Sequence, residues 1–302
     1  MYINKHINAV EMFARYWKTL VLIVAVVSIS TVMYLEFLQA HVRASVIVVS
    51  GFSTAISFFI AFFTAQAYDR WWEARKIWGT MVNDSRSFAR MVLTMFRAAD
   101  DQPEVSVMQE RLIRRHIAHL YAIKEQLRRE STGEYLNYLS EDDGRRVSGS
   151  SNAANALLQL QGEDIDAAER AGHIEVIRMA QFNDMLSRFS TSMGMAERIK
   201  TTIFPPYYAS MIRVSIWVFV VVFPLALSEQ IGYWAILFAS LLGMIFTLVF
   251  RAGQSLLYPF EGLPSDTPMS SIVRTIEINL LEQLGAQNIP APVQPLHGRY
   301  LM

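Results

Sequence analysis

Four long apolar segments stand out along the chain, separated by stretches in which charged residues are common. They cover residues 20–38, 44–66, 211–227 and 232–250. Each approaches the roughly 20 mainly apolar residues that an α-helix needs to cross the hydrocarbon core of a bilayer. The pattern therefore predicts an all-α integral membrane protein with four transmembrane helices, in which two helical hairpins flank a water-exposed region.

The water-exposed region between the second and third apolar segments, residues 68–203, follows a helical period. Apolar side chains recur every three or four residues in 105–129 and in 165–199, as on one face of an amphipathic helix. We expect a short helix at 151–160 and a turn at 161–164 between these two. The region is thus predicted to be a helical domain.

These segments divide the chain into four parts. They are 1–67 with the N-terminal lead and first two spans, 68–203 as a cytoplasmic helical domain, 204–251 with the last two spans, and 252–302 as a cytoplasmic C-terminal segment and tail. Basic residues are concentrated in the lead and directly after the second span. Because cytoplasmic loops carry an excess of Lys and Arg, we expect both termini in the cytoplasm.

The second apolar segment passes without a proline into a charged stretch. Residues 51–90 therefore predict one long helix, or two nearly collinear ones, that leaves the membrane. Thr54, Phe58 and Phe62 recur at i, i+4 and i+8 on one of its faces. A ladder of serines and alanines runs beside them, and small residues let helices approach closely in lipid. The two stripes suit a ring of identical helices with phenylalanines facing a shared axis. The alternative is that Phe58 and Phe62 face lipid or another helix.

Composition excludes several function classes. The 27 basic and 27 acidic residues give zero net charge, which argues against nucleic-acid binding. The chain has no cysteine, so disulfides and zinc thiolates are excluded. His116 and His119 share a helix face, but no third ligand joins them at metal-binding spacing, so a structural role is expected. The sequence has no phosphate-binding loop or nucleophile motif, and we predict no catalytic residue, no cofactor and no metal site.

An acidic segment precedes the third apolar segment. Residues 161–187 contain six acids against Arg170 and Arg178, a net charge of −4. The acids are Glu163, Asp164, Asp166, Glu169, Glu175 and Asp184. In a symmetric ring this charge would be repeated around the axis and could concentrate cations in a vestibule. An ordinary solvated helix face is the alternative.

Residues 68–86 resemble the signature of the bestrophin family of ion channels. The stretch reads YDRWWEARKIWG at 68–79 and NDSR at 83–86. The motif residues are Asp69, Arg70, Trp71, Trp72, Glu73, Arg75, Trp78, Asn83 and Arg86. IFP at 203–205, FPLA at 223–226 and RTIEINL at 274–280 support the resemblance. Tryptophans also mark membrane interfaces, and a purely anchoring role is the alternative for them.

The resemblance implies a homopentamer around one axial pore in a lipid bilayer, here a bacterial inner membrane. It places a membrane neck at Thr54, Phe58 and Phe62, and a second, cytosolic aperture at Ile177. The alternative for Ile177 is an ordinary core position. The partners implied are further copies of the chain, lipid and small inorganic ions.

The function predicted is conduction of monovalent ions, and the acidic segment favours cations such as sodium and potassium. A chloride channel of the same fold is one alternative. From another class, the alternative is a membrane-anchored helical scaffold that binds a partner protein.

The calcium clasp of animal bestrophins is reduced in this chain. The corresponding loop contains two acids, Glu261 and Asp266, with Pro264 between them. Calcium takes six to eight oxygen ligands, commonly from several carboxylates. We therefore expect no calcium clasp.

Overall fold

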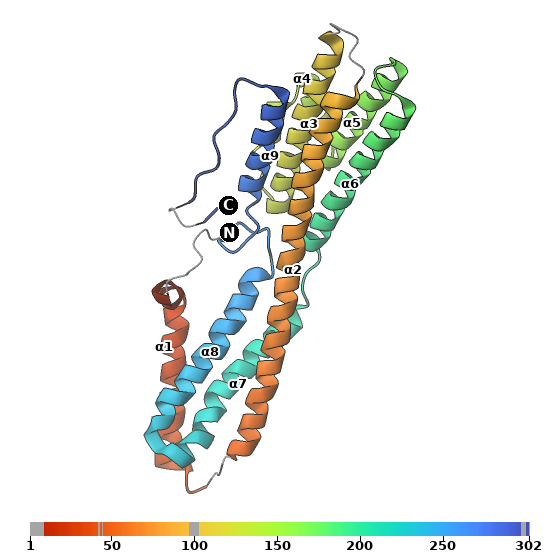
Figure 1. The fold of residues 1–302 in the computed structure, drawn as a ribbon. Helices are drawn as coiled ribbons and strands as arrows, with labels where there is room; N and C mark the ends of the chain where they lie inside the picture. The colour runs from red at the N-terminus through yellow and green to blue at the C-terminus, as the bar shows by residue number, and fades with distance from the viewer. Residues whose placement is uncertain (1–8, 42, 44, 97–102, 297–299, 302) are drawn as a thin grey trace. The chain divides into compact units, whose positions relative to one another are not determined.

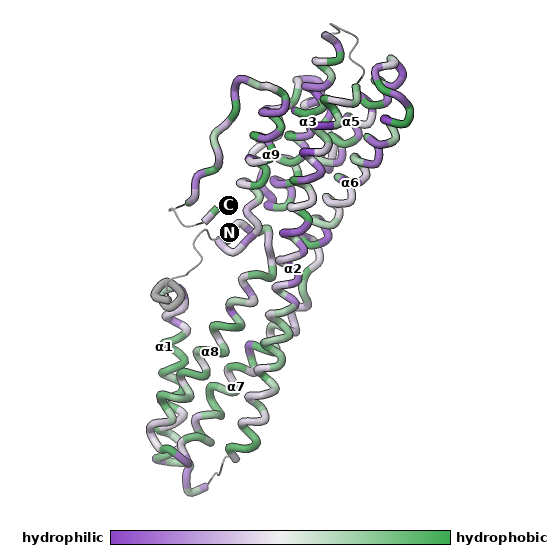
Figure 2. The backbone as a smooth tube through the Cα atoms, in the orientation of Figure 1, coloured by the Kyte–Doolittle hydropathy of each residue, from purple (hydrophilic) through white to green (hydrophobic). Residues whose placement is uncertain are grey.

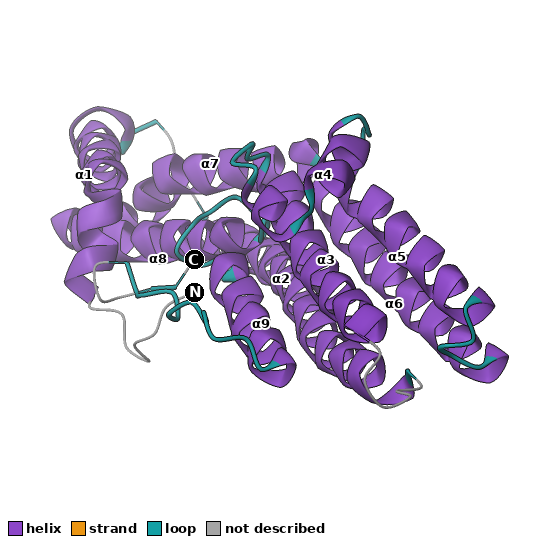
Figure 3. Ribbon diagram, turned by 90° about the horizontal axis from the view of Figure 1, so that it is seen from above, coloured by secondary structure: helices purple, strands orange, loops and turns teal. Residues whose placement is uncertain are grey.

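The computed structural model describes residues 9–41, 43, 45–96, 103–296 and 300–301, and these fold into helices joined by loops (Figure 1). The described ranges contain no strand, only one isolated bridge between Leu296 and Tyr300 (Figure 3). The prediction of an all-α fold is confirmed. Residues 1–8 of the expected N-terminal lead and residues 297–299 and 302 of the tail lie outside the described residues.

The chain forms two compact units, and the long helix α2 (Val46–Met95) contributes to both. One unit contains residues 4–71 and 203–257, and the other contains 72–202 and 258–302 among the described residues. α2 is a single helix of 50 residues. The absence of proline and the unbroken helical pattern explain its length.

The first unit is a bundle of apolar helices. They are α1 (Ala9–Met33), which continues as the π-helix η1 (Tyr34–Leu38), the first part of α2, α7 (Pro206–Ile231), the short η3 (Gly232–Trp234) and α8 (Ala235–Leu256). Three described stretches are long and apolar enough to cross a membrane: Ala14–Leu38, Val46–Met95 and Pro206–Leu256. The last comprises α7 and α8, which separate where Gly232 adopts a φ of 57°. These helices are mainly hydrophobic along their length (Figure 2).

Two glycines allow α8 to approach its neighbours closely. A Cβ at Gly243 would lie 3.0 Å from Val220 and 3.2 Å from Ile23. A Cβ at Gly253 would lie 2.9 Å from the Thr64 hydroxyl and 3.2 Å from the Phe63 ring. Any larger residue at Gly253 must therefore displace side chains of α2.

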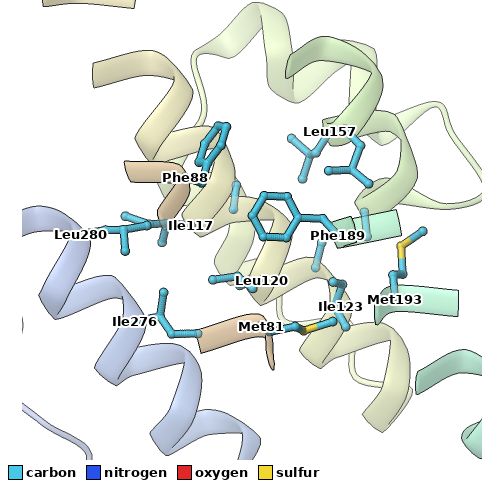
Figure 4. Packing of buried hydrophobic residues seen from close by; sticks show 14 of the residues in the cluster. Met81, Phe88, Ile117, Leu120, Ile123, Leu157, Phe189, Met193, Ile276 and Leu280 are labelled. Atoms are coloured by element: carbon cyan, nitrogen blue, oxygen red, sulfur yellow. The ribbon is translucent and has the colours of Figure 1, made fainter. Parts of the chain in front are cut away.

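The second unit packs helices around the rest of α2. They are α3 (Pro103–Arg128), η2 (Glu134–Tyr138), α4 (Glu141–Ser148), α5 (Ala153–Arg170), α6 (Val176–Thr201) and α9 (Met269–Leu284). Their core is shown in Figure 4. Phe88 of α2 meets Phe189 of α6 edge to face at 5.7 Å, and Ile117 of α3 lies close by. Side chains from α2, α3, α5, α6 and α9 thus interdigitate as in a close-packed interior.

The expected turn at 161–164 is wrong. α5 runs through these residues, and the break falls after Arg170, where Gly172 has a φ of 76°. Asn152 caps the helix by accepting a hydrogen bond from the Asn155 N–H. Gln161 is buried against α3, with its Nε2 3.5 Å from the Leu112 carbonyl. A polar run that looks like a turn in sequence is therefore a helix packed against its neighbour.

Candidate functional site

The first half of α2 has a buried face and an exposed face. Phe63 is fully buried and packs against Phe204 and Phe250, with ring centroids 5.5 and 5.1 Å away. On the other side, Phe58 is 69% exposed and Phe62 is 50% exposed. Their side chains are therefore available to lipid or to other copies of the chain.

Thr54 lies on the same exposed face, one turn before Phe58. Its hydroxyl donates to the Ser50 carbonyl at 3.0 Å. The oxygen lone pairs remain available to accept a hydrogen bond from water. The face therefore changes from polar at Thr54 to aromatic at Phe58 and Phe62, and its role as a neck stays a prediction.

Ile177 lies in the first turn of α6 and is 73% exposed, beside the equally accessible Val176. The next residue, Arg178, donates from Nη1 to the Met95 carbonyl of α2. Ile177 is thus outside the core of the chain, and the core alternative raised by the sequence does not describe its surroundings.

Three of the six acids of the acidic segment form ion pairs with arginines. Its ion pairs are Glu163 with Arg146 at 2.6 Å, Asp164 with Arg111 at 2.7 Å and with Arg115 at 2.8 Å, and Asp166 with Arg170. The hydrogen bond from Arg146 lowers the pKa of Glu163. Glu175 and Asp184 are exposed and Glu169 is half-buried. Adding Arg111, Arg115 and Arg146, together with Asp143, which also pairs with Arg115, to the six acids and two arginines of the segment leaves a net charge of −2. The role of these acids as vestibule charges stays a prediction.

The family motif on α2 contains residues of two kinds. Trp78 is fully buried in the core of the second unit, so it is not an interfacial anchor. Glu73 pairs with Arg198 of α6 at 2.7 Å. Arg86 donates from Nε and Nη2 to the Asn279 side chain of α9, at 3.1 and 2.8 Å. These residues hold α2 to α6 and α9.

The remaining motif residues lie nearer the surface. Trp71 packs against Tyr68 with ring centroids 5.9 Å apart, and Trp72 is exposed. Arg70 and Arg75 are half-buried, whereas Asp69 and Asn83 are exposed. The exposed motif residues can therefore contact solvent, lipid or another subunit.

His116 and His119 are both buried on α3. Nε2 of His116 lies 2.8 Å from the Ser85 hydroxyl, and Nδ1 of His119 lies 3.0 Å from the Ala154 carbonyl. Burial lowers the pKa of His119 to about 4 and lowers that of His116 well below its usual value. Both rings are therefore neutral core side chains near pH 7. No group of three possible metal ligands comes together among the described residues.

Two buried polar networks escaped the sequence analysis. Arg115 of α3 is buried and donates to both carboxylate oxygens of Asp143, to Asp164 and to the Leu160 carbonyl. In the other network, Glu277 of α9 is also buried. It accepts hydrogen bonds from the hydroxyls of Tyr121 at 2.6 Å and Tyr138 at 2.5 Å. An arginine beside the apolar stripe of α3 was the available signal for the first network.

The loop that replaces the calcium clasp uses its two acids within the chain. Glu261 pairs with Lys200 at 2.8 Å. Asp266 is buried and accepts from the Leu263 N–H, and burial raises the pKa of its carboxyl. Two such carboxylates fall short of the six to eight oxygens that calcium takes.

Ion currents through the reconstituted protein should therefore be unaffected by micromolar calcium. The measurement is macroscopic current while calcium is stepped from chelated to micromolar levels on each side. A saturable activation curve that disappears in Glu261→Gln would contradict this prediction.

A family model for bacterial and fungal bestrophin proteins matches residues 13–282. The voltage-dependent anion channel-forming protein YneE of Escherichia coli K12 is 30% identical over 242 residues, which cover 80% of this chain and 77% of the relative. A protein of the same description from Ralstonia nicotianae, RSc3414, is 28% identical over 89% of this chain and 87% of its own length. The crystal structure of a bacterial bestrophin homologue from Klebsiella pneumoniae superposes with a TM-score of 0.83. It is 25% identical, with 89% of this chain and 98% of that one covered.

Proposed function

This chain belongs to the bestrophin family, in its bacterial and fungal branch, and from that membership we propose that it is an anion channel. It assembles as a homopentamer in a bacterial inner membrane and passes small anions through one axial pore. The observation that carries the proposal is the exposed stripe of Phe58 and Phe62 on a helix of a channel-forming family. Five copies of this stripe form the membrane neck, with Thr54 at its polar end.

The expectation of monovalent cations is not supported. The curated relatives are described as anion channel-forming proteins. Three of the six acids that favoured cations are paired with arginines of α3, α4 and α5. The chloride alternative is therefore the better reading.

The proposed topology has four spans: α1, the first part of α2, α7 and α8. Both termini are cytoplasmic. The proposed division keeps 1–67 and 204–251 in the membrane, and 68–203 and 252–302 in the cytoplasm. The apolar stretches of the first unit support the spans, and the basic residues that flank them support the orientation.

Recording from planar bilayers tests the proposal. The purified protein should give unitary currents that reverse near the chloride equilibrium potential under a gradient of potassium chloride. Reversal near the potassium potential would restore the cation alternative. A membrane-anchored scaffold would give no unitary currents.

Ile177→Ala should change ion selectivity while the oligomer stays intact. In the proposed pore, five Ile177 side chains form the cytosolic aperture, and alanine would widen it. The reversal potential and size-exclusion profile of the variant measure these two properties. Val176→Ala is the matched control, since it removes a similar exposed side chain from the neighbouring position. A variant that dissociates without any change in selectivity would show that Ile177 serves assembly.

A further inference from the structure

The exposed face of α2 that carries Phe58 and Phe62 continues past the apolar part of the helix. An α-helix has 3.6 residues per turn, so positions 18 apart lie about five turns away at the same angle. Lys76 is 18 residues after Phe58, and Thr80 is 18 residues after Phe62. Both are exposed on one uninterrupted helix.

This continuation is polar and basic. We define the α2 polar face as the exposed residues Lys76, Thr80, Asn83 and Arg90. Its chemistry fits neither lipid contact nor burial in a protein core, because charged groups in either place need partners. A face of this kind borders water, including in an assembled protein.

Within the described residues, the charges of the α2 polar face have no counter-ion. Neither Lys76 nor Arg90 forms an ion pair with any residue in the ranges that the structure describes. The neighbouring acids are already paired, Glu73 with Arg198 and Asp84 with Arg188. Positive charge therefore dominates this part of α2.

One acid shares the angle of the face. Asp69 is exposed and lies seven residues before Lys76, about 10 Å along the axis at 1.5 Å per residue. Glu73, the other acid between Phe62 and Lys76, is paired with Arg198, so Asp69 against Lys76 and Arg90 leaves the face with net positive charge. In a ring of copies, that charge would raise the local concentration of anions.

We propose that Lys76 and Arg90 line the cytosolic part of the ion path and make it selective for anions. The inference rests on the proposed channel function and on the angle that Lys76 shares with Phe58, with Arg90, 14 residues after Lys76, about 40° from that angle. The residues act through water, as rings of charge that collect chloride or other small anions before they reach the neck.

Charge reversal tests the assignment. Lys76→Glu and Arg90→Glu should each lower the chloride-to-potassium permeability ratio roughly tenfold, the lower end of the enrichment that charged clefts produce. The control is Arg145→Glu, which reverses an exposed charge on α4. A wild-type protein without currents would refute the channel function itself. A wild-type anion channel whose selectivity survives both α2 substitutions would refute this inference alone.

Cysteine accessibility gives a second test, which does not depend on reversing the charge of Lys76. The natural chain has no cysteine, so Thr80→Cys is a single reactive thiol. A negatively charged methanethiosulfonate should block its current about tenfold faster than a positively charged one, and adding Lys76→Gln should remove the difference. The buried Ile77→Cys should not react. Equal rates for both reagents at Thr80→Cys would overturn the proposal even if the charge-reversed proteins fail to assemble.

Discussion

Replacing Phe62 with alanine should raise single-channel conductance several-fold, and Phe58→Ala should act in the same direction. The two residues lie one turn apart, about 6 Å along the helix axis. In the proposed pentamer they form two stacked apolar rings. A narrow apolar ring holds water poorly, so it opposes ions even without closing sterically. Recordings at matched voltage and salt measure the change.

The choice of control for these variants depends on the structure. By helical spacing alone, Phe59 and Phe63 lie about 100° from the stripe of Phe58 and Phe62. Replacing either with alanine would then leave the conductance unchanged. Phe63 is unsuitable because it is fully buried, and its truncation would cost about 3–5 kcal/mol of stability. Phe238→Ala on α8 is the matched control, since that ring is 54% exposed on another helix. Equal conductance changes in Phe238→Ala and Phe62→Ala would contradict the neck assignment.

Replacing Arg115 with alanine should lower the free energy of unfolding of the second unit by about 3–5 kcal/mol. The guanidinium is buried between α4 and α5 and pairs with Asp143 and Asp164. Its removal leaves the buried carboxylate of Asp143 without its counter-charge, whereas Asp164 keeps its ion pair with Arg111. Denaturant unfolding followed by circular dichroism measures the loss.

Arg145→Ala provides the comparison for Arg115. Its guanidinium pairs with Asp142 at the surface, 3.4 Å away, with both side chains mostly exposed. Exposed pairs contribute little, so unfolding should match the wild type. An Arg115→Ala protein as stable as the wild type would show that solvent reaches Asp143.

The sequence predicted those helices in which the spacing of apolar residues and the absence of proline agree. α2 was expected as one long helix or two nearly collinear ones because no proline interrupts it, and α3 agrees with the expected range within two residues. α9 was read only as a family motif, although Ile272, Ile276 and Leu280 recur at helical spacing. Hydrophobic spacing identifies a helix with an apolar stripe, but it does not identify the helix against which that stripe packs.

The candidate site shows the same limit. Helical spacing placed Thr54, Phe58 and Phe62 on one face, and the structure shows that face exposed. The charge of the acidic segment could not be judged from the sequence. Arg111 is 53 residues from Asp164, and Arg146 is 17 from Glu163. Such pairs depend on how α3, α4 and α5 pack together.

The close approach at Gly253 should make the proposed ion path sensitive to a residue outside that path. The Phe63 ring fills the space where a Cβ would be, and Phe62 is its neighbour in the chain. A methyl group at position 253 would push on Phe63 and turn α2 about its axis, which would re-aim the Phe62 ring. We expect Gly253→Ala to change conductance at a temperature where the protein remains folded. Substitutions at position 253 would then alter ion flow before they reduce the stability of the fold, and the effect on ion flow would limit which residues occur there.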